Sequence, residues 1–107
     1  MYNKFRLDEM IKGWFVGSFD PAVIKSDDFE VAVKRYKTGD YEESHTHKIA
    51  TEITVIVEGK VEMNGVEYVK DDIILIYPNN YTDFKCLEDT ITVVVKTPSI
   101  IGDKYLK

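Results

Sequence analysis

The 107-residue sequence contains one cysteine, Cys86, and two histidines. A single cysteine cannot form an internal disulfide, so we expect the reducing environment of the cytoplasm. No apolar run approaches the length of a bilayer-spanning helix. The first ten residues, MYNKFRLDEM, lack the apolar stretch that a secretory signal requires. These absences predict a cytoplasmic protein with no membrane partner.

A basic surface is also missing. The formal net charge is −5, and most lysines stand beside acidic residues, as in KSDD and VKDD. Binding of nucleic acid needs lysine and arginine gathered on one face, so we expect no nucleic-acid partner. The length fits one domain, and a composition of 31% charged and 44% hydrophobic residues is typical of a globular chain.

Short strand-like runs, separated by Gly, Pro, Asp and Asn, predict an all-β sandwich or barrel. These runs are GWFVGSF, FEVAVKRY, EITVIV, KVEMNGVEYV, DIILIYP and ITVVVK. The pair Asn64-Gly65 between alternating residues predicts a two-residue hairpin, because both turn positions need positive φ. The only helical signal is LDEMIKG near the N-terminus, which predicts a short helical turn that ends at Gly13.

Two of these runs, EITVIV and DIILIYP, are apolar on both faces. A strand that is hydrophobic on both sides must be covered on both sides. In a small barrel the outer cover can come from a second subunit. The pattern therefore predicts a homodimer.

The stretch GDYEESHTHKIATEITVIVEG carries the residues with chemistry. His45 and His47 are two apart, so on a strand they point to the same face. If the next strand folds back beside them, Glu52 approaches the same point. Two imidazoles and one carboxylate suit a divalent first-row metal with open coordination positions, such as Fe, Mn, Ni or Zn. A lone HxH pair on a surface strand has little specificity, so the spacing of the whole stretch matters more.

That spacing is G-x5-H-x-H-x4-E-x6-G, from Gly39 to Gly59. It resembles the first motif of the cupin superfamily at all five defining positions. The resemblance implies a double-stranded β-helix (jelly-roll) cupin barrel. It also implies one cupin domain over 1–107, with the barrel at about 36–96, an N-terminal strand and helix segment at 1–35, and a C-terminal tail at 97–107.

The second cupin motif, G-x5-P-x-G-x2-H, is degenerate in DDIILIYPNNYTDFKC. One register puts Asp71 and Asn79 at the two glycine positions and Thr82 at the position of the family's fourth metal ligand. A second register, shifted by one residue, puts Asp83 at that position. In the first register Thr82, Phe84 and Cys86 share the inward face, which alternation favours. In either register the fourth histidine is absent.

Several other side chains are candidates to line the pocket. They are Tyr36, Tyr41, Thr54, Tyr77, Phe84 and Cys86. Because both histidines are assigned to the metal, an acid or base role falls to Glu43, Asp83, Glu88, a tyrosine or metal-bound water. Cys86 is more simply explained as a small residue of a late strand.

The resemblance leaves more than one function open. A metal at the barrel centre predicts an enzyme that acts on a small polar or sugar-like metabolite, by isomerisation, epimerisation or Fe(II)-dependent dioxygen chemistry. The alternative is a non-enzymatic protein that binds or senses a small molecule, with a structural or vestigial metal site. No catalytic residue is assigned at this stage, because a fold hosts many chemistries.

Overall fold

The computed structural model describes all residues, Met1–Lys107, and is built almost entirely of strands. Its elements are the 3-10 turn η1 (Leu7–Glu9) and the strands β1 (Trp14–Gly17), β2 (Ile24–Lys25), β3 (Glu30–Tyr36), β4 (Tyr41–Thr46), β5 (Thr51–Glu58), β6 (Lys60–Met63), β7 (Val66–Val69), β8 (Ile73–Ile76), β9 (Thr82–Cys86), β10 (Thr90–Thr97) and β11 (Tyr105–Leu106). The prediction of an all-β jelly-roll barrel with a short N-terminal helical turn is confirmed. None of its helical structure is long enough to cross a bilayer.

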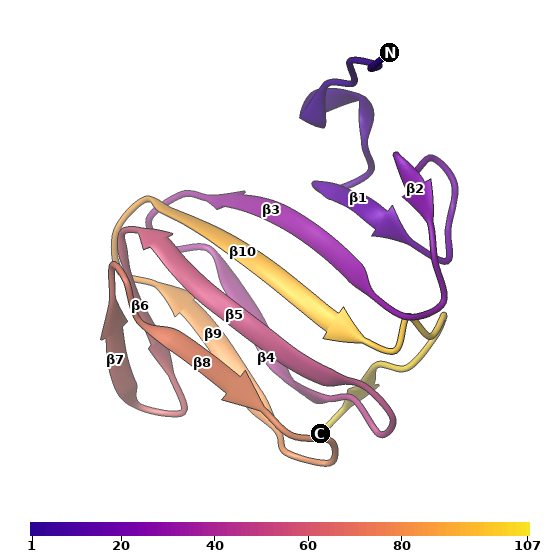
Figure 1. Cartoon of the computed structure of the whole chain (residues 1–107). Coiled ribbons are helices and arrows are strands. Elements are labelled where there is room, and N and C mark those ends of the chain that lie inside the picture. Colours follow the sequence, from indigo (N-terminus) through magenta and orange to yellow (C-terminus); the bar gives the residue numbers. More distant parts are fainter.

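The strands form two facing sheets (Figure 1). One sheet has six strands in the order β2-β1-β3-β10-β5-β8, and the other has five in the order β11-β4-β9-β6-β7. Strand β10 lies in the middle of the larger sheet, antiparallel to both β3 and β5. Its register places Lys96 between Glu30 of β3 and Glu52 of β5, so charged side chains from three strands meet in one row.

The predicted hairpin at Asn64-Gly65 is confirmed. Met63 pairs with Val66 across the turn, and Asn64 and Gly65 have φ values of 51° and 80°. Positive φ at both central residues is what a type I′ turn requires, and its twist matches that of the flanking strands. This turn is therefore determined by two adjacent residues rather than by distant contacts.

One end of the barrel interior is filled by a hydrophobic core. Its members come from β5, β6, β8 and β9: Ile56, Val61, Met63, Ile76, Phe84 and Cys86. All are buried, and Tyr36, Tyr68 and Ile74 pack against them. Met63 and Phe84 of this core also line a polar cavity, so the core and the cavity adjoin inside the barrel.

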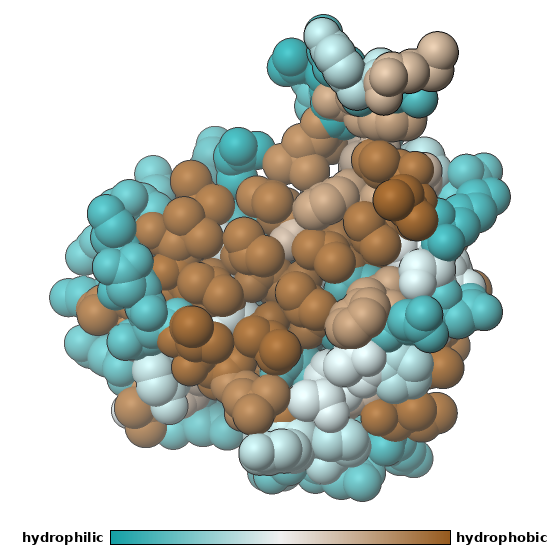
Figure 2. All heavy atoms as spheres, viewed as in Figure 1, coloured by the Kyte–Doolittle hydropathy of each residue, from teal (hydrophilic) through white to brown (hydrophobic).

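The outer side of the large sheet is apolar. Figure 2 shows a broad hydrophobic surface over β3, β10, β5 and β8. We call it the outer apolar face; the register puts these residues on it: Val31, Val33, Ile53, Val55, Ile73, Leu75, Ile91, Val93 and Val95. Ile73 and Leu75 are exposed, and the others are half-buried. The sheet is thus apolar on its outer side and carries charged residues on its inner side.

Gly39 and Gly59 stand at the two ends of the histidine-bearing stretch, and Gly59 forms the turn between β5 and β6. Replacement of each glycine by alanine tests how tightly that turn is packed. Gly59 has φ +105°, and a Cβ there would lie 2.4 Å from Thr90 Oγ1 and 2.5 Å from the Asp89 carbonyl oxygen. Gly39 has φ +91°, and a Cβ there would meet nothing within 4 Å. Gly39→Ala should cost about 1–2 kcal/mol of unfolding free energy from backbone strain alone. Gly59→Ala should cost about 1–3 kcal/mol more, because the methyl group also displaces its neighbours. Equal urea midpoints for the two variants would contradict this assignment.

Candidate functional site

The open end of the barrel contains a cavity of about 230 Å³. Its lining comes from both sheets, with side chains from β1, β3, β4, β5, β6, β9 and β10. His45, His47 and Glu52 all line it. The structure therefore brings the three predicted metal ligands to one cavity, which is the first requirement of the predicted site.

His47 is held in place by the C-terminal tail. Its Nδ1 contacts the backbone carbonyl oxygen of Asp103, and a carbonyl can only accept, so Nδ1–H is the donor. The neutral ring then carries its lone pair on Nε2. That Nε2 atom is buried and has no hydrogen-bond partner. A ring fixed through Nδ1, with a free Nε2 facing a cavity, is the usual arrangement of a metal-binding histidine.

His45 and Glu52 complete the set. The Nδ1 atom of His45 lies 3.1 Å from the Glu43 carbonyl oxygen, so its Nε2 also carries the lone pair. Glu52 Oε1 lies 3.5 Å from His47 Nε2, and Glu52 Oε2 accepts a hydrogen bond from the Thr54 hydroxyl at 3.2 Å. Each of the three side chains thus has one atom bonded or fixed and another left as a potential donor to a metal.

The fit to a metal ion is partial. Two donors on one ion, with bonds of about 2.0–2.2 Å, lie roughly 3–3.5 Å apart, which matches His47 Nε2 and Glu52 Oε1. The His45 and His47 rings have centroids 5.3 Å apart and planes at 79°, a spacing that two imidazoles bound to one ion can have. Even so, no group of three or more His, Cys, Asp or Glu side chains is close enough to hold a metal as it stands. His47 and Glu52 suit the ion directly, and His45 is the ligand that would have to reorient.

The charge state of Glu52 suits the same role. Burial on its own would raise the pKa of the Glu52 carboxyl, but the neighbouring His47 ring and the Lys96 ammonium hold that pKa below its ordinary value. Lys96 is its cross-strand neighbour on β10. Glu52 is therefore an anion at neutral pH, as a carboxylate ligand must be.

The degenerate second motif lies beside this cavity. Thr82 lines it and is paired with His45 across β4 and β9. Asp83 does not line it, because its side chain accepts the Asn64 N–H at 2.7 Å at the hairpin turn. Asp71 and Asn79 have φ values of 77° and 68°, as residues at glycine positions would. These placements agree with the register in which Thr82 occupies the fourth-ligand position.

A bulge in β4 explains a residue that sequence reasoning missed. The pairing of β4 with β9 shifts register between Glu42 and His45, so three steps on β4 oppose two on β9. Strict alternation from His45 would turn Glu43 inward, but the bulge turns Glu42 inward instead. Glu42 lines the cavity and accepts a 2.7 Å hydrogen bond from the Tyr36 hydroxyl. Burial first, and then the charge of Glu42, raises the pKa of Tyr36, which keeps its proton.

The six predicted pocket-lining residues divide into two groups. Tyr36, Thr54 and Phe84 line the cavity. Tyr41 and Tyr77 do not, and they are 59% and 63% exposed, because the bulge and the pairing of Ile76 with Glu52 turn them outward. Cys86 is on the inward side of β9 but lies in the hydrophobic core, and burial raises the pKa of its thiol to about 11.

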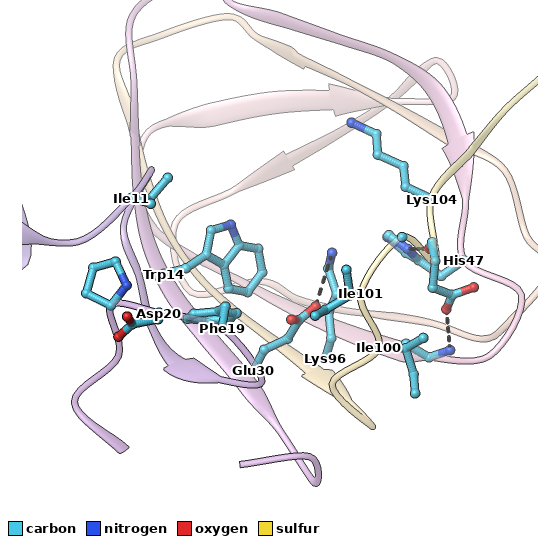
Figure 3. Close-up of a pocket in the computed structure, with 14 residues that line it drawn as sticks. Ile11, Trp14, Phe19, Asp20, Glu30, His47, Lys96, Ile100, Ile101 and Lys104 are labelled. Atoms are coloured by element: carbon cyan, nitrogen blue, oxygen red, sulfur yellow. Dashed lines mark hydrogen bonds and ion pairs between the residues drawn. The ribbon is translucent and has the colours of Figure 1, made fainter. Parts of the chain in front are cut away.

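A second cavity of about 340 Å³ adjoins the first. Trp14, His47, Lys96 and Lys104 line both. Figure 3 shows Lys96 between Trp14 and His47, with its amine close to the Glu30 carboxylate, 3.6 Å away. The sequence did not predict that lysines line the cavity, because an isolated lysine in a strand normally indicates a side exposed to solvent.

Comparison with solved structures identifies the architecture. An uncharacterized conserved protein with a double-stranded β-helix domain from Klebsiella pneumoniae matches with a TM-score of 0.72 and 22% identity, over 97% of this chain and 90% of that one. A sugar phosphate isomerase from a cupin superfamily, from Silicibacter pomeroyi, matches at 0.61 and 20%, over 65% and 50%. The DMSP lyase DddQ from Ruegeria pomeroyi matches at 0.72 and 17%, over 88% and 49%. No family model and no curated protein matches the sequence.

The tail contact at Asp103 is testable. Its carboxylate is 5% exposed and accepts the backbone N–H groups of Lys48, Ile49 and Ala50 at 2.9–3.3 Å. Asp103→Ala should lower the unfolding free energy by about 2–4 kcal/mol at pH 7, because buried N–H groups lose their acceptor. Asp28→Ala, at an exposed carboxylate, should have little effect.

The pH dependence of that difference follows from the Asp103 pKa. Burial opposes the charge, but the three backbone N–H groups and His47 hold the pKa below its ordinary value. This stabilisation is complete above the unfolded-state pKa and is lost as pH falls through the folded-state pKa. The difference in unfolding free energy between wild type and Asp103→Ala, measured with urea, should therefore decrease as the pH is lowered. A difference that increases would contradict the role assigned to Asp103.

Proposed function

Because the chain has the cupin fold, we propose that it binds a divalent metal through His45, His47 and Glu52 and acts there on a small polar or sugar-like molecule. The observation that carries this proposal is the buried, unpartnered Nε2 atom of His47, which lies 3.5 Å from a Glu52 oxygen at the cavity wall. A buried polar atom without a partner is costly, and a metal ion would satisfy it.

When bound, such a metal supplies Lewis-acid polarisation of a ligand oxygen. The chain's own contribution is a hydrogen-bonded pair on the same cavity wall, Tyr36 and Glu42. Tyr36 Oη donates a 2.7 Å hydrogen bond to Glu42 Oε1, and both residues line the cavity. Tyr36 keeps its own proton and positions the Glu42 carboxylate, which can accept a proton from a bound ligand and return it. This pair supports an isomerase or epimerase more than an oxygenase, and oxygen uptake with Fe(II) would reveal the latter.

A second candidate function is non-enzymatic binding of a small molecule. It is favoured by one observation: no group of three or more potential ligand side chains lies close enough to hold a metal as it stands. A protein of this kind would bind the same metabolite without converting it. Exchange of substrate protons with solvent, followed by NMR, distinguishes the two functions, because only the enzyme would catalyse it.

The metal site itself is tested by equilibrium binding to tag-free protein. We expect about one Zn²⁺ or Ni²⁺ per chain by elemental analysis. His47→Ala and Glu52→Gln should weaken binding at least tenfold, because each removes a ligand. Glu58→Gln is the matched control on the same strand, at an exposed carboxylate that pairs only with Lys70. Binding by His47→Ala with unchanged affinity would refute the proposed site.

We further propose that the protein is a homodimer joined through the outer apolar face. This face is contiguous across four strands, and contiguous exposed apolar surfaces of this kind usually mark an interaction site. Its middle carries no charge, and Arg35 lies at one end beside Ile91. An uncharged centre suits a second copy of the same face in a two-fold arrangement. Val93 on β10 lies at its middle, between Val33 and Val55.

The proposed interface can be tested with one charge. Val93→Lys should convert a dimer into a monomer, because an ammonium at the centre of an apolar interface would be buried without a partner. Val66→Lys is the control, since Val66 is an exposed valine in β7 of the other sheet. Sedimentation velocity measures both. If the wild-type protein sediments as a monomer at micromolar concentration, the proposed dimer is wrong.

A further inference from the structure

Four lysines line the cavity of the proposed metal site: Lys12, Lys34, Lys96 and Lys104. The only acidic side chains on the same walls are Glu42 and Glu52. The chain as a whole has a net charge of −5, so the excess of lysines at this cavity is opposite in sign to the overall charge. A cleft with an excess of one sign of charge attracts small ions of the opposite sign.

Lys34 and Lys96 converge on one aromatic ring. Their amines lie 5.1 Å and 4.9 Å from the ring centroid of Trp14. Lys96 is 17% exposed and pairs with Glu30 at 3.6 Å, whereas none of the ion pairs of the structure includes Lys34. Lys34 is thus a half-buried ammonium whose nearest identified contact is an indole face rather than a carboxylate.

The electrostatics of Lys34 agree with this geometry. Burial lowers the pKa of its ammonium, and the charges of Lys96, Lys12 and Lys104 lower it further, against the opposing effect of Glu42. Three other cationic residues therefore act on Lys34 at close range. An anion that bound among these amines would relieve their mutual repulsion.

The lysines also stand at a junction. Lys96 and Lys104, with Trp14 and His47, line both this cavity and the adjacent one (Figure 3). A molecule bound at the junction would lie beside both the ammonium groups and the His47–Glu52 pair, because Lys96 is the cross-strand neighbour of Glu52. The cavity volume of about 230 Å³ limits the occupant to a small molecule.

We infer that the cavity takes a small organic anion, whose carboxylate or phosphate group is bound by Lys34, Lys96 and Lys104 beside Trp14. The inference rests on the proposed function and deepens it by naming the chemical class of the ligand. The cavity contains no arginine, so the charged group is recognised by separate point charges rather than by a planar fork. The rest of the ligand extends toward the His47–Glu52 pair, where the reaction of the proposed function occurs.

The single tryptophan of the chain provides the readout, because Trp14 lies within the lysine group. Inorganic phosphate and malonate are titrated separately into tag-free protein, with and without Zn²⁺, while Trp14 emission is followed. We expect a saturable change with at least one probe, and the probe that binds identifies the oxyanion. Failure of both probes to produce a saturable change, with and without Zn²⁺, would overturn the inference.

Variants that remove the same charge at different places distinguish anion binding at this site from nonspecific electrostatic attraction. Lys34→Gln should weaken anion binding at least tenfold, and Lys104→Gln should weaken it as well. Lys85→Gln, at an exposed lysine of β9 that lines neither cavity, should leave it unchanged. Calorimetry provides a second readout, because removal of Lys34 also alters the surroundings of Trp14. An equal loss of affinity in Lys34→Gln and Lys85→Gln would reject the site.

The two proposals fail in different ways. If His47→Ala loses Zn²⁺ as expected but neither anion binds to the wild type, the ligand class is wrong and the metal site stands. If phosphate or malonate binds in a manner that depends on Lys34 while no metal binds, the proposed function is wrong and the anion site stands. Circular dichroism of each variant checks that it is folded.

Discussion

The site depends on one interaction, the capping of a loop by Asp103. This carboxylate accepts the N–H groups of Lys48, Ile49 and Ala50, and its own carbonyl oxygen accepts Nδ1–H of His47. The loop begins with His47 and joins β4, which carries His45, to β5, which carries Glu52. Pairing of β11 with His45 and Thr46 adds a second contact from the same tail. A residue 56 positions away in sequence thus decides which nitrogen of His47 faces the cavity.

The large sheet reverses the usual distribution of polarity. Val31 and Val33 of β3 lie on its outer side, while Lys34 and Tyr36 point into the cavity. A hydrophobic pattern by itself assigns the apolar side of a strand to the core of the protein. Here part of the inner side surrounds a polar cavity, and Ile56 and Ile76 of the same sheet face the adjoining core. The same reversal creates both the charged cavity and the apolar surface proposed as an interface.

Local features could be predicted because their causes are local. The turn at Asn64-Gly65 needs only the backbone preferences of two residues, and the left-handed conformations of Asp71 and Asn79 occur where the degenerate motif places glycine. Glu42 could not be predicted, because the bulge that turns it inward depends on the pairing of β4 with β9. Tyr41, Tyr77 and Cys86 do not line the cavity for related reasons. The pairing with neighbouring strands decides which face of the sheet a side chain points to and where along the barrel it lies.

The sequence by itself determined the fold class, the hairpin and the convergence of His45, His47 and Glu52 on one cavity, because each follows from spacing along a strand or from turn preference. Only the tertiary structure decided what else surrounds these residues. The lysines around Trp14 and the contact of Asp103 with His47 join strands or loops that are separated in sequence. The Tyr36–Glu42 pair is only six residues apart, but it depends on the bulge that the pairing of β4 with β9 creates. Such contacts depend on register and sheet packing, and spacing along one strand carries no information about either.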